Sequence, residues 1–387
     1  MVIATRAEEL VDIAKSFAPQ IEAARDESER ERSMPAALAR AMAESGLFRI
    51  WVPRELGGFE ADLAMNLRVI EEVSKADGAA GWNVMIGTTA GMFIGYVPPE
   101  TGRAIYADPN AIIAGAVNPK GQAVPEDGGY RLKGRWPLAS GCMNATWIGG
   151  GSFVIENGAP RVVNGIPDLT MCLFPREDVT IHDTWDSAGL RGTGSHDIEV
   201  KDIFVPQERT YSLLSAKPYY DGPLYRGNFI NVFSPPVAAV ALGIARAALD
   251  EFVALASGKM PVFTATILRD KPTVQSQFGR AEALVRSARA LLFEVNDSLW
   301  QSMCADEPIT DEQQVMTRTA CAFTAKSCAE AVTMVYTMGG ATSVYETSKL
   351  ARCFRDAHVV TQHIAVQEQL YERTGKYFLG LGFQPFG

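Results

Sequence analysis

The spacing of hydrophobic residues changes twice along this chain, and this pattern constrains its fold more than any other feature. Up to about Tyr106 hydrophobic residues recur every three to four positions, which predicts amphipathic helices. From about Ala111 to Thr210 they alternate in short segments between turn residues, which predicts strands. From Pro235 onward the helical spacing returns in longer segments. The predicted order is therefore helices, then strands, then helices.

This order predicts an α+β fold in three parts. We expect an N-terminal α-helical domain over residues 1–110, a middle antiparallel β domain over 111–212 and a C-terminal four-helix bundle domain over 213–387. Thr5 and Glu8 have the spacing of a capping box, and Asn157-Gly158 is a strong hairpin turn. The expected helices are 35–44, 61–75, 79–91, 236–257, 275–303, 310–338 and 348–378.

Charge and cysteine content exclude several classes of function. The net charge of −9 argues against nucleic acid, whose phosphate backbone needs a basic face. The six cysteines are scattered, without a C-x-x-C pair or a histidine at zinc spacing, so we expect neither a metal site nor a disulfide framework. The first residues lack the apolar core of a secretory signal, and no run approaches the roughly 20 apolar residues of a membrane span. We therefore expect a cytoplasmic protein.

Common nucleotide and hydrolase motifs are missing from the sequence. Gly192-Thr193-Gly194 has part of a dinucleotide-binding fingerprint, but it lacks a third glycine at the right spacing and lies in the strand-rich region. The sequence has no P-loop and no G-x-S-x-G nucleophile elbow.

Several short motifs follow one another in an order that is specific as a set, although each is weak alone. They are GLF at 46–48, VP at 52–53, LGG at 56–58, GLRGTGS at 189–195, VP at 205–206, YTMGG at 336–340 and RDA at 355–357. In this order and spacing the chain resembles the acyl-CoA dehydrogenase superfamily over nearly its whole length. The resemblance implies that superfamily's fold, with helical, β and helical domains.

Details of the motifs resemble one branch of that superfamily. Residues 116–121 (AVNPKG) stand where the dehydrogenases have a T-E-P-x-x-G-S-D flavin-binding stretch. Residues 134–142 (GRWPLASGC) and 355–363 (RDAHVVTQH) resemble the two-component, or group D, flavin-dependent monooxygenases. That branch includes the 4-hydroxyphenylacetate hydroxylase oxygenase component, the secosteroid phenol hydroxylase and the dibenzothiophene monooxygenase. Ile364 stands about where common dehydrogenases have their catalytic glutamate.

The resemblance implies a flavin-dependent monooxygenase. Such an enzyme uses reduced flavin and O₂, through a C4a-hydroperoxyflavin, to oxygenate a small aromatic or heteroatom-bearing substrate. It implies FMN, with FAD possible, supplied by a separate NAD(P)H:flavin reductase, and a homotetramer. Two alternatives stay open: an FAD-dependent acyl-CoA dehydrogenase or nitroalkane-type oxidase, and a catalytically silent binding protein on the same scaffold.

The resemblance also implies site residues. The catalytic candidates are His363, Ser140 and Ser195; the cofactor-binding candidates are Trp136, Ser140, Gly141, Arg191, Ser195, Arg269, Gln275, Gly339 and Gly340. Ser140 and Ser195 lie in glycine-bounded segments, where backbone N–H groups can approach a ligand. Serine is also common in ordinary turns, and a large aromatic such as Trp136 is more often a core residue.

Two of the four histidines lie close together near the end of the chain. His363 shares an apolar stripe with Val360 and Val366 if 348–378 is one helix, and His358 then points about 140° away. We therefore expect His363, whose imidazole titrates near neutrality, to orient or deprotonate the substrate. We expect His358 to be structural, His182 to be a strand residue and His196 to be a loop residue near the flavin.

Overall fold

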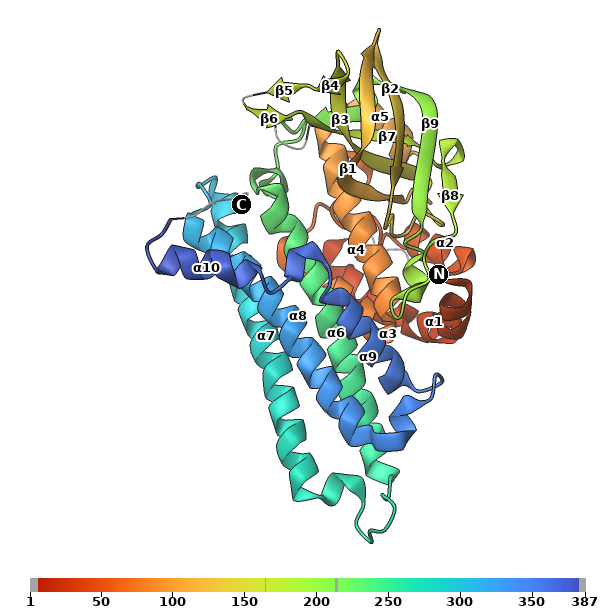
Figure 1. Ribbon diagram of the computed structural model, residues 1–387, viewed down its shortest axis with the longest axis vertical. Helices are drawn as coiled ribbons and strands as arrows, with labels where there is room; N and C mark the ends of the chain where they lie inside the picture. The colour runs from red at the N-terminus through yellow and green to blue at the C-terminus, as the bar shows by residue number, and fades with distance from the viewer. Residues whose placement is uncertain (1–5, 164, 213–214, 383–387) are drawn as a thin grey trace. The chain divides into compact units, whose positions relative to one another are not determined.

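The computed structural model describes residues 6–163, 165–212 and 215–382 and confirms the order of helices, strands and helices (Figure 1). The chain forms two compact units. One comprises residues up to Ala61, Asn83–Ser187 and Arg191–Tyr225, and the other comprises Asp62–Trp82, Ala188–Leu190 and Arg226 onward. The bounds of the three domains expected from the sequence stay a prediction. The capping box expected at Thr5 lies outside the described residues.

A mixed β-sheet forms the centre of the first unit. Its strand order is β10-β7-β3-β1-β2-β9-β8, and β4 pairs with β3. The strands are β1 (Ile113–Glu126), β2 (Gly129–Trp136), β3 (Trp147–Glu156), β4 (Ala159–Pro160), β7 (Leu169–Pro175), β8 (Thr180–His182), β9 (Asp197–Pro206) and β10 (Thr210–Ser212). A separate pair joins β5 (Val162–Val163) to β6 (Ile166–Pro167). The predicted hairpin turn at Asn157-Gly158 is confirmed, since both residues have positive φ between β3 and β4.

The expectation of an antiparallel sheet is wrong for one pair, because β1 and β3 run parallel. Strand β2 folds back antiparallel on one edge of β1. The connection 137–146 then returns the chain past β1, so that β3 enters on the other edge in the direction of β1. This crossover connection contains Ser140.

The sheet core is built around Trp136. The ring is fully buried, lies 6.0 Å from the ring of Phe174, and donates Nε1–H to the carbonyl of Gly151 at 2.6 Å. A Cβ at Gly134 would lie 2.8 Å from this ring. Glycine at that position therefore makes room for the indole.

Helices add to the sheet in the first unit. They are α1 (Leu10–Glu31), α2 (Ala36–Glu44) and α5 (Pro99–Tyr106), and α4 (Gly78–Phe93) contributes its residues from Asn83 onward. In α1 the buried residues Leu10, Ile13, Phe17 and Ile21 recur at helical spacing, as the sequence predicts.

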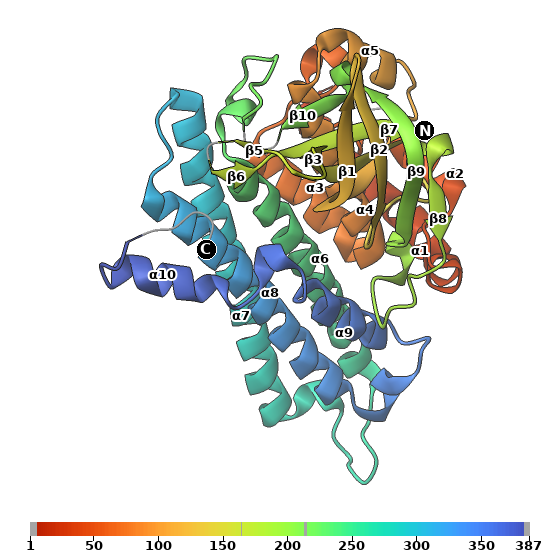
Figure 2. The ribbon, with the colours of Figure 1, turned by 45° about the horizontal axis from the view of Figure 1, so that its top comes forward.

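The second unit is helical. It contains α3 (Leu63–Ala76), α6 (Phe229–Gly258), α7 (Pro272–Ala305), α8 (Asp311–Gly339), α9 (Lys349–Val360) and α10 (Leu370–Phe378), and α6, α7 and α8 run side by side in both views (Figures 1 and 2). Alanines in the first two thirds of α6, from Ala238 to Ala248, are buried, and a Cβ at Gly243 would lie 2.4 Å from the carbonyl oxygen of Glu71 in α3. Small residues thus allow close helix packing.

Two of the family motifs meet in this unit. The carboxylate of Asp356 accepts a hydrogen bond from the backbone N–H of Leu190 at 2.6 Å. A Cβ at Gly189 would lie 2.6 Å from the backbone of Arg355, so the backbones approach too closely for a side chain there. The motifs at 189–195 and 355–357 are therefore parts of one contact.

Helix α6 is more apolar than the expectation of no membrane-spanning segment allows. Among the described residues this helix is long and apolar enough to cross a membrane, but 89% of its most apolar 18-residue window is buried inside the protein. Helix α6 is thus the core helix of its unit.

The expected helix over 348–378 is wrong in its second half. Helix α9 ends at Val360, a short 3₁₀ helix covers Ile364–Val366, and α10 begins at Leu370. The Thr361 hydroxyl donates to the carbonyl of His358 at 2.7 Å, and His363 Nδ1 accepts from the N–H of Ala365 at 3.2 Å. Such local bonds compete with helix continuation.

Candidate functional site

Three hydroxyl groups form a buried chain beside the sheet of the first unit. The Oγ atoms of Ser140 and Ser195 lie 2.6 Å apart, and Ser195 Oγ lies 2.6 Å from Thr193 Oγ1. All three side chains are buried. Backbone bonds hold the two loops together, with Gly141 N–H donating to the carbonyl of Thr193 at 2.8 Å. The structure therefore brings together the two serines that the sequence singles out.

The backbone around these hydroxyls adopts left-handed conformations. Gly141 and Gly194 have φ of 79° and 57°, which glycine adopts easily, but Leu138 has φ of 61°. A non-glycine residue in this region costs about 1–3 kcal/mol, and such residues cluster at functional sites. The Leu138 side chain is 63% exposed, so packing does not explain its conformation. Leu138 is thus an exposed apolar residue two positions before Ser140.

Asn83 supplies an unsatisfied polar atom in the same unit. Its Nδ2 donates to the carbonyl of Gly192 at 3.2 Å, whereas its buried Oδ1 has no hydrogen-bond partner in the described part of the chain. A Cβ at Gly141 would lie 3.4 Å from that oxygen. Buried polar atoms are nearly always paired, so this atom marks the loop as a place for a ligand or water.

Other candidates in the first unit have structural partners. Trp136 is the centre of the sheet core described above. Arg191 donates to the carbonyls of Glu29 and Ser187 and pairs with Asp186 at 3.1 Å. The Nδ1 of His196 accepts from the N–H groups of Thr184 and Trp185, both at 3.2 Å. These contacts fix the loop that carries Thr193 and Ser195.

His363 lies in an aromatic environment in the second unit. Its ring centroid is 5.4 Å from that of Trp82, edge to face, and 5.7 Å from that of Phe233. Burial lowers the pKa of His363 to about 4, because an imidazolium ion would lose its hydration there. The ring is therefore neutral at pH 7.

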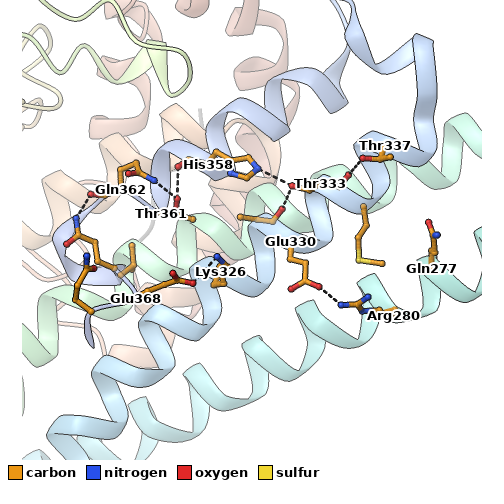
Figure 3. Close-up of a pocket in the computed structure, with 15 residues that line it drawn as sticks. Gln277, Arg280, Lys326, Glu330, Thr333, Thr337, His358, Thr361, Gln362 and Glu368 are labelled. Carbon is orange, nitrogen blue, oxygen red and sulfur yellow. Dashed lines mark hydrogen bonds and ion pairs between the residues drawn. The ribbon is translucent and has the colours of Figure 1, made fainter. Parts of the chain in front are cut away.

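His358 has different surroundings. Its Nε2 lies 3.0 Å from Thr333 Oγ1, and its ring contacts that of Phe354 at 4.6 Å. It lines a groove of about 620 Å³ on α7, α8 and α9, together with the ion pairs Lys326–Glu368 and Arg280–Glu330 (Figure 3). The expected angle of 140° between the two histidines assumed that both lie on one helix. This assumption is wrong, since α9 ends before His363. The structure nevertheless separates their environments.

The remaining candidates lie at helix ends in the second unit. Arg269 is exposed, pairs with Asp270 at 3.7 Å, and its carbonyl accepts from Gln275 Nε2 at 3.1 Å near the start of α7. Gly340 has φ of 58° directly after α8, and the carbonyl of Gly339 accepts from Lys259 Nζ. With ψ of −148°, Gly340 adopts a conformation that is essentially restricted to glycine, which explains the residue type at this helix end.

Sequence reasoning missed several of these residues. Trp82 and Phe233 lie far from His363 along the chain, so no spacing links them. Asn83 carries a weak signal, as the only residue of α4 with an amide or charged side chain. Among the described residues no group of three or more His, Cys, Asp or Glu could hold a metal ion. The six cysteines are free thiols, of which Cys304 alone is exposed.

Comparison with known proteins links both units to one family. The family model "Acyl-CoA dehydrogenase, N-terminal domain" matches residues 5–101, and "Acyl-CoA dehydrogenase, C-terminal domain" matches residues 236–368. Indole-3-acetate monooxygenase of Pseudomonas putida is 35% identical over 92% of this chain and 89% of its own length. The flavin-dependent monooxygenase oxygenase subunit HsaA of Rhodococcus jostii is 27% identical over 94% of this chain and 96% of its own. XiaF from Streptomyces sp., solved with FADH2 and glycerol, superposes with a TM-score of 0.89, at 27% identity over 97% of this chain and 96% of its own.

Proposed function

This chain belongs to the acyl-CoA dehydrogenase family, and on that premise we propose that it is the oxygenase component of a two-component flavin-dependent monooxygenase. The observation that carries the proposal is the environment of His363. An acyl-CoA dehydrogenase needs a carboxylate to remove the α-proton of its substrate. Here the position next to His363 is Ile364, and the imidazole is neutral among Trp82 and Phe233.

The loop residues of the first unit fit a flavin. The Ser140, Thr193 and Ser195 hydroxyls would supply hydrogen-bond donors and acceptors, Gly141 would leave room beside the unpaired Asn83 oxygen, and the exposed Leu138 would supply an apolar contact. The chemistry that reduced flavin supplies when bound is two electrons for O₂, so that one oxygen atom enters the substrate and the other leaves as water.

In this proposal Ser195 holds a proton within the hydroxyl chain, and the surroundings of His363 exclude water. Ser195 is the middle hydroxyl, so it can donate to one neighbour while it accepts from the other. Neutral His363, in its apolar surroundings, orients the aromatic substrate in a water-poor environment. Arg269, Gln275, Gly339 and Gly340 stay candidates for the flavin phosphate.

The relatives support further parts of the proposal. We expect a separate NAD(P)H:flavin reductase, because one relative is named an oxygenase subunit, and an aromatic substrate related to indole-3-acetate. FMN stays our prediction for the cofactor, and FAD is the alternative favoured by the XiaF complex. We also propose a cytoplasmic homotetramer; light scattering that reports a stable monomer at micromolar concentration would refute the tetramer.

Isotope labelling tests the reaction. The protein receives FMN or FAD that a flavin reductase reduces, together with indole-3-acetate, indole or resorcinol, under ¹⁸O₂. The expected result is one ¹⁸O atom in the aromatic product, detected by mass spectrometry. Hydrogen peroxide without labelled product from every probe would refute oxygen transfer to these substrates. Oxidation of the substrate by oxidised flavin, without the reductase, would indicate an oxidase or dehydrogenase, and a protein that does not bind flavin would indicate a binding protein.

A further inference from the structure

Helix α6 contains two consecutive prolines in its interior. Pro235 and Pro236 lie inside the helix Phe229–Gly258, well after its first turn. A proline in a helix interior has no N–H to donate, and its ring clashes with the carbonyl four residues earlier. The carbonyls of Asn231 and Val232 therefore receive no helix hydrogen bond from these two positions. The part of α6 before the prolines is thus held to the rest of the helix by fewer hydrogen bonds than usual.

The residues before the prolines have hydrogen bonds of their own. We call Asn228–Ser234 the capped segment. The Oδ1 of Asn228 accepts the N–H of Asn231 at 3.0 Å, which caps the helix start. The hydroxyl of Ser234 donates to the carbonyl of Ile230 at 2.7 Å. These bonds lie within the capped segment, so it can keep its shape while its connection to the rest of α6 bends.

Phe233 joins the capped segment to an aromatic cluster. Its ring stacks on that of Phe229, with centroids 5.3 Å apart, and lies 5.7 Å from the ring of His363. The other neighbour of this imidazole is Trp82, at 5.4 Å. Rings whose centroids are about 4.5–7 Å apart are in direct contact, so no third ring fits between Phe233 and His363. An aromatic ligand can take this place only if Phe233 moves.

The packed position of the capped segment leaves a side-chain amide unsatisfied. Asn231 is fully buried, and neither its Nδ2 nor its Oδ1 has a hydrogen-bond partner in the described part of the chain. A buried polar group without a partner has lost its hydration and gained nothing in return, so it opposes the packed position. Movement of the segment toward water would restore hydrogen bonds to this amide.

One exposed hydrogen bond fastens the capped segment to α8. The Nδ2 of Asn228 donates to Oε1 of Gln314 at 3.0 Å. Water competes with a bond between exposed side chains, so this fastening is weak. Two residues earlier, Nη1 of Arg226 donates to the carbonyl of Met303 at 3.1 Å, near the end of α7. The segment therefore follows a fixed point at Arg226 and is followed by the two prolines.

We propose that the capped segment is a gate. It turns about Pro235 and Pro236, moves Phe233 away from His363, and admits the aromatic ring of the substrate to the space that Phe233 vacates. The identity of the ligand rests on the proposed function, whereas the motion does not. The contact of Phe233 with His363 favours the closed position, and the buried amide of Asn231 favours the open one. Opposing contributions of this kind bring two positions close in free energy, as a gate requires.

Hydrogen exchange of the flavin-free protein tests the motion without any activity. Exchange of backbone amides, followed by mass spectrometry, reports local opening. The double substitution Pro235→Ala and Pro236→Ala restores two N–H donors to α6. We therefore expect the amides of Phe233 and Ser234 to exchange about 10-fold more slowly in this variant. Pro19→Ala is the control, since it restores a donor inside α1 and should leave these amides unchanged. Equal exchange in wild type and the double variant would overturn the inference.

Gln314→Ala tests the same motion in the opposite direction. This change removes the fastening to α8 and leaves the sequence of α6 intact. We expect the amides of the capped segment to exchange roughly 3-fold faster or more. Exchange no faster than in wild type would count equally against the gate.

Product formation tests whether the gate admits the substrate. A substrate that binds only the open position loses apparent affinity as that position becomes rarer. With indole-3-acetate under ¹⁸O₂, we expect kcat/KM of the double proline variant to fall about 10-fold at unchanged flavin affinity. Unchanged kcat/KM would refute the role in substrate entry. A wild-type protein that forms no labelled product with any aromatic probe refutes the proposed function instead, and hydrogen exchange then still decides the motion.

Discussion

The hydroxyl oxygens of Ser140 and Ser195 lie 2.6 Å apart, although the two residues are 55 positions apart in the chain. Ser140 lies in the crossover connection between β2 and β3, and Ser195 lies just before β9. Because β1 and β3 are parallel, the chain must cross over between β2 and β3, and this crossover places Ser140 where its hydroxyl can bond that of Ser195.

The first prediction concerns Ser195→Ala. This change removes the hydroxyl that bonds both Ser140 and Thr193, so we expect the free energy of unfolding to fall by about 1–3 kcal/mol. Flavin affinity should fall as well. Urea denaturation and flavin titration measure the two effects. Ser152→Ala is the control. Ser152 is a buried serine of β3 whose hydroxyl donates to a backbone carbonyl, and its loss should leave flavin affinity unchanged.

The second prediction concerns the left-handed conformation of Leu138. Leu138→Gly relieves the strain, which we expect to raise the free energy of unfolding by up to about 1 kcal/mol. It also removes the exposed apolar side chain, so flavin affinity should fall about 10-fold, in line with the burial of one leucine. Leu138→Met keeps the apolar surface and should keep the affinity. A glycine variant that binds flavin as tightly as wild type would exclude a contact between Leu138 and the cofactor.

The sequence predicts the regular part of this structure well. Buried residues of α1 such as Leu10, Ile13 and Phe17 recur at the period of a helix, and that period reports the burial of one face. The motifs also suffice to recognise the family and to single out Ser140 and Ser195.

Features that depend on distant contacts could not be predicted. Hydrophobic alternation is the same in parallel and antiparallel strands, so it does not reveal the direction of β3 relative to β1. The break after Val360 depends on single hydrogen bonds of Thr361 and His363, which leave the hydrophobic pattern unchanged. Trp82 and Phe233 meet His363 only through the packing of separate segments.

The third prediction separates a core role of Trp136 from a cofactor role. Trp136→Phe removes the N–H group bonded to the buried carbonyl of Gly151, so we expect the free energy of unfolding to fall by about 1–3 kcal/mol. The flavin affinity of the folded protein should not change, because the indole is fully buried in the sheet. A folded variant with an affinity at least about 10-fold weaker would show that the ring serves the cofactor.

The last prediction is a pH dependence of stability that His363 causes. Burial lowers the pKa of its imidazole to about 4 in the folded protein, below the value of about 6.5 in the unfolded chain. Above pH 6.5 both states hold this ring neutral, and its contribution is constant. As the pH falls from about 6.5 to 4, the unfolded chain gains a proton that the folded protein does not, so stability is lost. At about 1.4 kcal/mol per pKa unit, the loss is on the order of 3 kcal/mol.

Wild type should therefore lose that much more free energy of unfolding than His363→Gln between pH 7 and 4, as measured by urea denaturation. His196 and His358 also have lowered pKa values through burial, but they are common to both proteins. Parallel curves for the two proteins would mean that the ring of His363 is hydrated, and would remove the water-poor environment on which its proposed role depends.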